Sequence, residues 1–220
     1  QMCIRDRSYP SPAKTPPRQE KLWYQGQFTR LNIIGQFRRT YILCESEDGL
    51  VLIDQHAAHE RIYYEQLLQR GKTANAAVQK LLIPETIELS HREAALLQNL
   101  LTVLAPLGFD IEPFGGTTFA IKAAPVMLLP GELGPVIREI LEKALTAGST
   151  AARETVLDDS VKIMACHGAI RAHQALDTRQ IRRLLQQMDE CANPSHCPHG
   201  RPTWIRWTEK ELEKAFGRQA

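Results

Sequence analysis

A short apolar run that leads directly into a polar segment constrains the fold of this chain more than any other feature. Residues 50–53 have the length and composition of a buried strand, and Asp54-Gln55-His56-Ala57-Ala58-His59-Glu60 follows them without a break. A helix of about 15 residues is expected to continue from there to Arg70 and to end at Gly71. The junction predicts a mixed α/β domain in which polar side chains gather where a buried strand ends.

The patterns on either side of this junction extend the α/β interpretation. Apolar alternation and turn residues predict strands at 28–34, 39–45, 81–89, 109–113, 117–123 and 203–207. Helices are expected at 132–146, 158–173 and 178–190, and also after two capping boxes, Ser90 with Glu93 and Thr208 with Glu211. The order strand, helix, strand, strand, helix between 78 and 157 suits a small α/β sandwich, so the expected fold class is α/β (α+β).

Composition narrows the functional classes. A net charge of +2 gives no large basic field, so binding of nucleic acid by this chain alone should be weak and sensitive to salt. No apolar run approaches the length of about 18 residues that a transmembrane helix needs, and the opening residues lack the apolar core of a secretory signal, so we expect a cytoplasmic protein. The 5 cysteines lack the spacing of a disulfide framework, which favours metal ligation or buried thiols.

Asp54, His56 and Glu60 form the first candidate group for metal binding. His56 and Glu60 are one helical turn apart and share a face, and Asp54 ends the preceding strand. Carboxylates and imidazoles are usual ligands of divalent cations, although Asp54 could equally cap the helix and leave the other two as ordinary first-turn residues. Glu65 points away from His56 at 100° per residue, so we expect it to have a supporting, packing or interface role. His59 is expected to be partly exposed.

Thiol and imidazole side chains later in the chain form a second candidate group. Cys197-Pro198-His199-Gly200-Arg201-Pro202 places a Cys and a His two residues apart in a stiff loop, and thiolate with imidazole selects zinc-like metals. Cys166 lies among small residues of a predicted helix, where it is either a further ligand or a buried apolar side chain. The spacing also leaves open a local structural zinc site made of Cys191, His196, Cys197 and His199.

Three motifs in this order resemble those of the C-terminal domain of endonuclease-type MutL proteins. They are Asp54-Gln55-His56-Ala57 with Glu60 and Glu65, then Ala165-Cys166-His167 with Ala169-Ile170-Arg171-Ala172, and finally Cys197-Pro198-His199-Gly200-Arg201-Pro202. The resemblance covers residues 23–218. It implies metal ligands at Asp54, His56, Glu60, Cys166, Cys197 and His199, of which the first three are catalytic, with Gln55 and Glu65 as supporting motif residues.

The resemblance also implies a domain organisation and an activity. Residues 1–22 would be a proline-rich leader or linker, 23–77 with 158–220 a dimerisation and catalytic subdomain, and 78–157 an inserted regulatory subdomain that binds the sliding clamp. The implied activity is metal-dependent nicking of DNA in bacterial mismatch repair, with zinc in a structural or regulatory role and manganese for turnover. Nothing in the chain resembles an ATPase motif, so no nucleotide is expected.

The implied partners are a second copy of the chain, DNA, the sliding clamp and, through the full-length protein, a mismatch-recognition protein of the MutS type. Gln79-Lys80-Leu81-Leu82-Ile83-Pro84 is similar to the Gln-x-x-Leu-x-Pro peptides that bacterial proteins insert into the clamp, and its binding residues would be Gln79, Leu82, Ile83 and Pro84. A plain edge strand is the alternative for this segment.

Basic side chains supply candidates for contact with DNA. Arg179, Arg182 and Arg183 share one predicted helix and Arg201 lies in the Cys197 loop, although each could be an ordinary solvated charge. The competing functional hypothesis is a catalytically silent module for dimerisation and clamp docking that holds a structural zinc ion.

Overall fold

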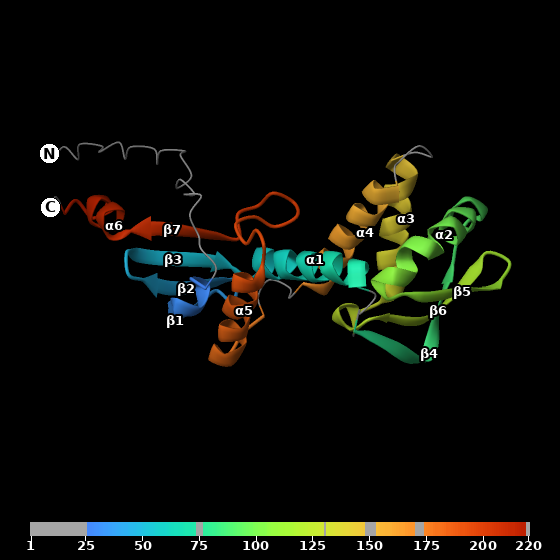
Figure 1. Cartoon of the computed structure of the whole chain (residues 1–220), viewed down its shortest axis with the longest axis horizontal. Helices are drawn as coiled ribbons and strands as arrows, with labels where there is room; N and C mark the ends of the chain where they lie inside the picture. Colours follow the sequence, from blue (N-terminus) through green and yellow to red (C-terminus); the bar gives the residue numbers. More distant parts are fainter. Residues whose placement is uncertain (1–25, 74–76, 130, 148–152, 170–173, 219–220) are drawn as a thin grey trace, which may run out of the picture.

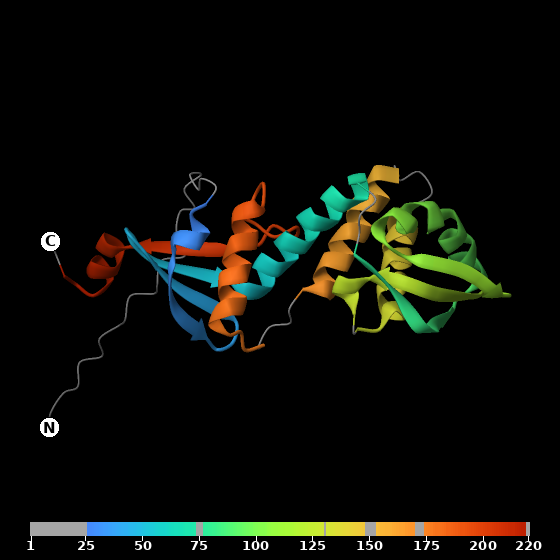
Figure 2. The same ribbon diagram turned by 60° about the horizontal axis from the view of Figure 1, so that its bottom comes forward.

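The computed structural model describes residues 26–73, 77–129, 131–147, 153–169 and 174–218. Within these ranges, seven strands form two antiparallel sheets and six α-helices pack around them. The molecule is elongated, with one lobe around each sheet and two helices between the lobes (Figure 1, Figure 2). This architecture confirms the α/β (α+β) fold class.

The first lobe is built on a four-stranded sheet with the order β1-β2-β3-β7. Its strands are β1 (Asn32–Phe37), β2 (Tyr41–Ser46), β3 (Gly49–Asp54) and β7 (Trp204–Thr208). The helix α5 (Thr178–Glu190) covers it, and the fully buried Ile42 and Ile53 pack with Leu184 of α5 in one apolar cluster. Thr208 and Glu211 form the predicted capping box of α6 (Glu209–Ala215).

The second lobe is built on a three-stranded sheet with the order β4-β6-β5. Its elements are β4 (Val78–Glu88), α2 (His91–Leu104), β5 (Asp110–Gly115), β6 (Thr118–Pro125) and α3 (Leu133–Ala147), which follow the predicted strand, helix, strand, strand, helix order. Short 3₁₀ turns lie at Ala105–Leu107 and Val126–Leu128. The predicted capping box of Ser90 and Glu93 starts α2, and Leu97 of this helix is fully buried in the lobe's apolar cluster.

The helices α1 (Gln55–Thr73) and α4 (Arg153–Gly168) pack against each other between the lobes (Figure 2). Tyr64 of α1 donates a hydrogen bond of 2.6 Å to Asp158 of α4, and Lys162 pairs with the same carboxylate at 2.6 Å. Because α1 starts at the first sheet and α4 contacts α3, this pair of helices joins the metal-binding candidates to the second lobe.

Several predicted element bounds are wrong. The helix α1 continues through Gly71 to Thr73, since one glycine in a helix costs only about 1 kcal/mol. The helix α4 begins at Arg153 rather than 158, because Val156 and Leu157 pack against the apolar cluster of the second lobe. It ends at Gly168 rather than 173. The predicted subdomain boundary at 157/158 therefore falls inside α4, and the division into 23–77 with 158–220 and 78–157 stays a prediction.

Another wrong bound is at the start of the first lobe, where a strand was expected at 28–34. Residues Phe28–Arg30 form a 3₁₀ turn instead, and β1 begins at Asn32. The carboxylate of Asp189 on α5 accepts hydrogen bonds of 2.9 Å from the backbone N–H groups of Phe28 and Thr29. This long-range cap holds the turn, and nothing local in the sequence indicates it. The predicted leader, 1–22, lies outside the described residues.

Within the described ranges, none of the helices is both long enough and apolar enough to cross a bilayer.

Candidate metal centre

The first candidate side chains lie at the junction of β3 and α1. Asp54 ends β3, and its Oδ1 accepts hydrogen bonds from the backbone N–H groups of His56 (3.0 Å) and Ala57 (3.1 Å). Gln55 is fully buried, and its side chain accepts a hydrogen bond from Gln36 and donates one to the backbone oxygen of Gln174. These contacts show Asp54 as the N-terminal cap of α1, with Gln55 as a buried anchor beneath it.

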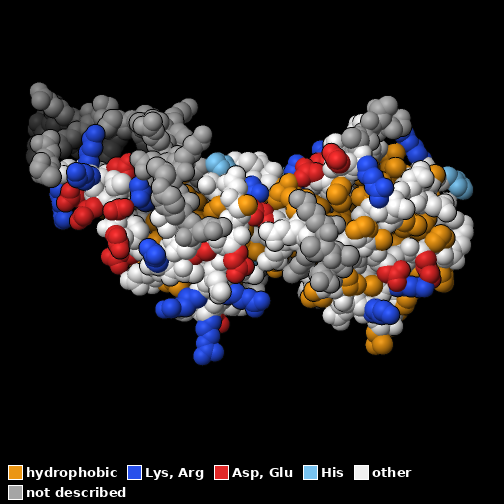
Figure 3. Space-filling model, viewed as in Figure 1, with side chains coloured by type: hydrophobic (Ala, Val, Ile, Leu, Met, Phe, Trp, Pro, Cys, Tyr) orange, Lys and Arg blue, Asp and Glu red, His pale blue; other side chains and the backbone are white. Residues whose placement is uncertain are grey.

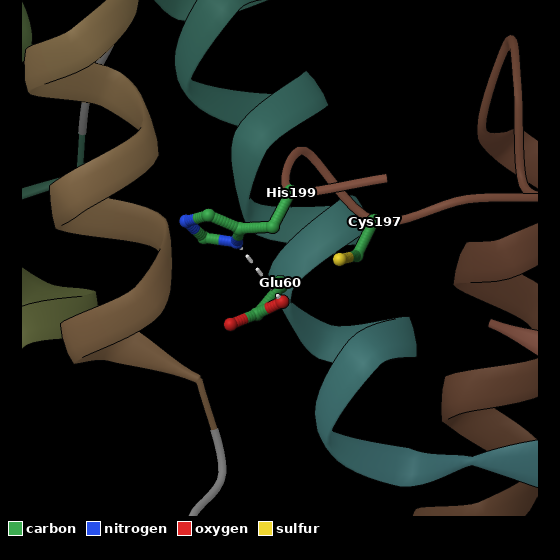
Figure 4. Close-up of side chains that lie close together, drawn as sticks. All are labelled: Glu60, Cys197 and His199. Atoms are coloured by element: carbon green, nitrogen blue, oxygen red, sulfur yellow. Dashed lines mark ion pairs between the residues drawn. The ribbon is translucent and has the colours of Figure 1, made fainter. Parts of the chain in front are cut away.

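The centre of the site is a group of three side chains from α1 and the loop before β7. Ligand atoms of Glu60, Cys197 and His199 all lie within 4.8 Å of one another, and within the described residues no other set of three or more His, Cys, Asp or Glu side chains meets this condition. In Figure 4, His199 and Cys197 of the loop extend toward the Glu60 carboxylate on the helix. Glu60 is only 3% exposed, so its charge lies almost entirely away from water.

Two further candidates contact the same carboxylate. The Nε2 of His56 lies 3.2 Å from one oxygen of Glu60, and the Nδ1 of His199 lies 3.5 Å from the other. Cys166, at the end of α4, is electrostatically coupled to Glu60. Cys166 is exposed as a residue, so its interpretation as a buried apolar side chain is wrong. Glu60 is therefore the common partner of His56, Cys166, Cys197 and His199.

The raised pKa values of the two thiols at the site favour their protonated form near pH 7 in the metal-free chain. Desolvation of the sulfur, followed by the negative charge and hydrogen bond of Glu60, raises the pKa of Cys166 to about 11. Burial also raises the pKa of Cys197, although backbone hydrogen bonds within its loop act in the opposite direction. A divalent cation would lower the pKa of both thiols, because it stabilises thiolates. It would also offset the negative charge of the buried carboxylate.

The donor set fits a metal ion. One carboxylate, two thiols and two imidazoles converge, and thiolate with imidazole suits zinc while carboxylate oxygens suit manganese. A cleft of about 500 Å³ lies beside the group and is lined by side chains of α3, α4 and the loop, including Glu139, Lys162 and His199. Since His199 is 44% exposed, the site is open to solvent on this side.

The local zinc site that the spacing left open does not assemble. Cys191 is buried in the apolar cluster of the first lobe, and its sulfur donates a hydrogen bond to the backbone oxygen of Gln187 at 3.4 Å. His196 contributes its backbone to a bridge with Pro202 and is not part of the group around Glu60. Within the described residues, Cys197 and His199 thus combine with α1 rather than with their sequence neighbours.

Glu65 and His59 do not join the metal-binding group. Glu65 lies on another side of α1, where its carboxylate accepts hydrogen bonds from the backbone N–H groups of Ala192 (2.6 Å) and Asn193 (3.1 Å). His59 is only 6% exposed, so the prediction that it is partly exposed is wrong. Its Nδ1 lies 2.7 Å from the oxygen of Gln55, and burial lowers its pKa to about 4, so it is neutral near pH 7.

The predicted clamp-binding peptide lies in β4, at the edge of the three-stranded sheet. Gln79 still pairs with Ala124 of β6, but the register then shifts: β4 advances from Lys80 to Glu85 while β6 advances only from Ala123 to Ile121. Leu82 is 99% exposed and Ile83 81% exposed, and Pro84 is also exposed. The segment is therefore an edge strand whose apolar residues bulge out of the ladder, which a plain edge strand would not show.

The candidate DNA-contact residues lie on the surface. Arg179, Arg182 and Arg183 are exposed on α5, and Arg201 is exposed in the Cys197 loop. The charge of Arg201 acts on Cys166, which places this guanidinium near the metal-binding group.

Fold and site together define a mixed α/β domain with a candidate metal centre held between a helix and a loop. A family model described as the MutL C terminal dimerisation domain matches residues 34–176, which is more than half of the chain. The chain belongs to the MutL C-terminal dimerisation domain family. The match includes Asp54, His56, Glu60 and Cys166 and ends before Cys197 and His199.

The curated relatives that the chain matches are MutL proteins. The chain is 43% identical over 193 residues to the DNA mismatch repair protein MutL of Trichlorobacter lovleyi, a stretch that covers 88% of this chain and 33% of that protein. It is 44% identical over 195 residues to the MutL of Citrifermentans bemidjiense (88% and 30% covered) and 41% identical over 208 residues to that of Pelobacter propionicus (94% and 34% covered). The chain thus spans about a third of the length of the curated relatives it matches.

Proposed function

We propose that this chain is the metal-dependent endonuclease domain of a bacterial mismatch-repair protein, and that it nicks one strand of DNA. The convergence of Glu60, Cys197 and His199 from α1 and a distant loop carries this proposal. A divalent cation bound there would supply a Lewis acid that acidifies water and offsets negative charge on the attacked phosphate. The names of the relatives support a role in DNA mismatch repair.

Each residue of the site has a proposed role that follows from its position. Glu60 lies between His56, Cys166, Cys197 and His199, so these five side chains are the proposed first ligands. Asp54 ends the adjoining strand and holds the start of α1 through two backbone N–H groups, which orients His56. Its carboxylate is also proposed as a ligand and catalytic group. Thiolate and imidazole favour zinc in a structural or regulatory role, and the carboxylates favour manganese for turnover.

The proposed partners follow from the family and from two surfaces. The family is one of dimerisation domains, so we propose a homodimer, formed by the subdomain made of 23–77 and 158–220. The exposed Leu82 and Ile83, with Gln79 and Pro84, support docking of the inserted subdomain to the sliding clamp. DNA would contact Arg179, Arg182, Arg183 and Arg201, and a mismatch-recognition protein would act through the full-length protein in the bacterial cytoplasm.

A catalytically silent module for dimerisation and clamp docking is the second candidate. It is favoured by the two thiols around Glu60, because thiolates are typical of structural zinc sites. The open cleft beside His199 supports the endonuclease instead, since a structural site is closed by its ligands whereas a catalytic one keeps a position for water or substrate.

Nicking of supercoiled plasmid in manganese tests the proposal, with the sliding clamp present and absent. The wild type should convert plasmid to the open circular form, and Asp54→Asn and Glu60→Lys should lose this activity while zinc content and dimer mass are recorded. Asp110→Asn, an exposed carboxylate of β5, is the matched control and should nick like the wild type. Equal activity of all four proteins would mean a contaminant or another site. No nicking by an intact dimer with clamp present would favour the docking module.

A further inference from the structure

Two residues of α1 that follow Glu60 hold the loop that carries Cys197 and His199. The Nε of Arg61 donates a hydrogen bond of 2.5 Å to the backbone oxygen of His196, the residue before Cys197. Arg61 also pairs with Glu65 one turn later at 3.6 Å, and Glu65 accepts hydrogen bonds from Ala192 and Asn193 at the start of the same loop. Both side chains are mostly buried, with 13% and 11% of their areas exposed.

The loop keeps its own shape through internal hydrogen bonds, but these do not connect it to α1. Cys197 donates from its backbone N–H to the oxygen of Arg201 at 2.8 Å, and Gly200 donates to Cys197 at 2.9 Å. Such bonds form a tight turn that presents Cys197 and His199 on one side. The distance from this turn to Glu60 is therefore set by hydrogen bonds between the loop and α1. Arg61 makes one of them with His196, and Glu65 makes two with Ala192 and Asn193.

Arg61 is itself fixed by its surroundings. Its guanidinium lies 5.4 Å from the ring centre of Tyr64, whose hydroxyl is bound to Asp158 of α4. A guanidinium remains charged at any ordinary pH and offers several donors in a fixed plane, so it can hold a carbonyl oxygen and a carboxylate at once. Arg61 therefore has a defined position from which it holds the backbone next to Cys197.

We propose that Arg61 is a positioning residue that sets the distance between the Cys197 and His199 loop and Glu60, and so tunes how tightly the site binds a metal ion. The inference rests on the proposed metal site. Its physical basis is that Arg61 adjoins Glu60 in one rigid helix while it holds the residue next to Cys197 in the loop. Residues that orient metal ligands without contacting the ion typically change its affinity by about 10- to 100-fold when they are replaced.

Titration of the metal-free 220-residue chain with Co²⁺ tests this role, read by the near-ultraviolet absorption of cobalt bound to thiolate. Arg61→Met keeps the aliphatic stem but removes every donor, so Co²⁺ should bind about 10- to 100-fold more weakly and with an altered spectrum. Arg61→Lys keeps one cationic donor and should bind with intermediate affinity. Arg92→Met, at an exposed arginine on α2, is the matched control and should bind like the wild type.

The outcomes separate this inference from the proposed function. An Arg61→Met protein that binds Co²⁺ with the wild-type affinity and spectrum would overturn the positioning role and leave the metal site intact. A wild type without any thiolate absorption would refute the metal site itself. If Arg61→Met does not fold, as judged by circular dichroism, Arg61→Lys and Glu65→Gln decide the question. Wild-type affinity in both of these would also overturn the role.

Discussion

Buried polar side chains gather in α1 and beside the four-stranded sheet, whereas the interior of the lobe around the three-stranded sheet is apolar. Among the described residues, six polar or charged residues are buried, and five of them belong to α1 or to the segment just before β7: Gln55, His59, Glu60, Glu65 and Thr203. The second lobe has an apolar interior, and large apolar side chains are more than half exposed on both lobes: Leu82, Ile83 and Phe114 on the second, and Ile34, Phe37 and Phe216 on the first. Figure 3 shows hydrophobic side chains spread over the surface of this second lobe.

This difference indicates which buried side chains depend on polar partners and which depend on apolar packing. Buried polar groups are stable only when they are hydrogen-bonded, paired or bound to a metal. Of the two buried carboxylates of α1, Glu65 accepts hydrogen bonds from backbone N–H groups, whereas Glu60 is surrounded by the other candidate metal ligands. Covering exposed apolar side chains with a partner lowers the free energy, so the exposed apolar residues of either lobe are sites at which docking would be favourable.

The largest expected effect concerns the buried carboxylate of the first lobe. Zinc at about 1,000 times its dissociation constant should raise the free energy of unfolding of the wild type by about 4 kcal/mol, because the ion binds only the folded state. Glu60→Gln should lose this gain, and without metal it should be as stable as the wild type or more so, since it removes a buried charge. Guanidinium unfolding with and without zinc measures both effects. An equal gain in the variant would show that the ion binds elsewhere.

The second prediction concerns the apolar interior of the second lobe. Leu97→Ala should lower the free energy of unfolding by about 3 kcal/mol, because Leu97 is fully buried and its truncation leaves a cavity. The affinity of the folded protein for Co²⁺ should stay at the wild-type value, since Leu97 lies in the cluster of the other sheet. A parallel loss of metal affinity would mean that the two lobes are energetically coupled through α1 and α4.

The smallest expected change in stability comes from the exposed side of the second lobe. Leu82→Ala combined with Ile83→Ala should alter the free energy of unfolding by less than about 0.5 kcal/mol, as surface substitutions do. Affinity for a purified bacterial sliding clamp should fall at least about 30-fold if the two side chains are its anchors. Undiminished clamp binding would show that Leu82 and Ile83 do not anchor the clamp. A large loss of stability would show that these side chains pack in the interior of the lobe.

Local signals in the sequence predicted much of the fold. The capping boxes of Ser90 and Thr208 and the hairpin of β5 and β6 depend on residues only a few positions apart, and all three are present. The start of β1 and the first turn of α4 were wrong, because they depend on contacts with Asp189 and with the second apolar cluster. A residue 161 positions away cannot be inferred from a local pattern.

The same limit applies to the candidate site. The motifs supplied the residues around Glu60, but the spacing alone left open whether Cys197 and His199 combine with α1 or with Cys191. Arg61 was missed, although its spacing from Glu65 is that of an ion pair on a helix. The burial of His59 could not be foreseen, since it depends on the packing of α1 between distant segments.

The irregular pairing of β4 has a consequence for how copies of this chain behave in concentrated solution. An edge strand with unpaired backbone groups invites strands of other molecules to add to the sheet, and long flat edges promote aggregation. In β4 the stretch between Lys80 and Glu85 departs from the regular ladder, and Pro84 has no N–H to donate. The protrusion that exposes Leu82 and Ile83 therefore also interrupts the regular edge that a strand of another molecule would need in order to add to this sheet.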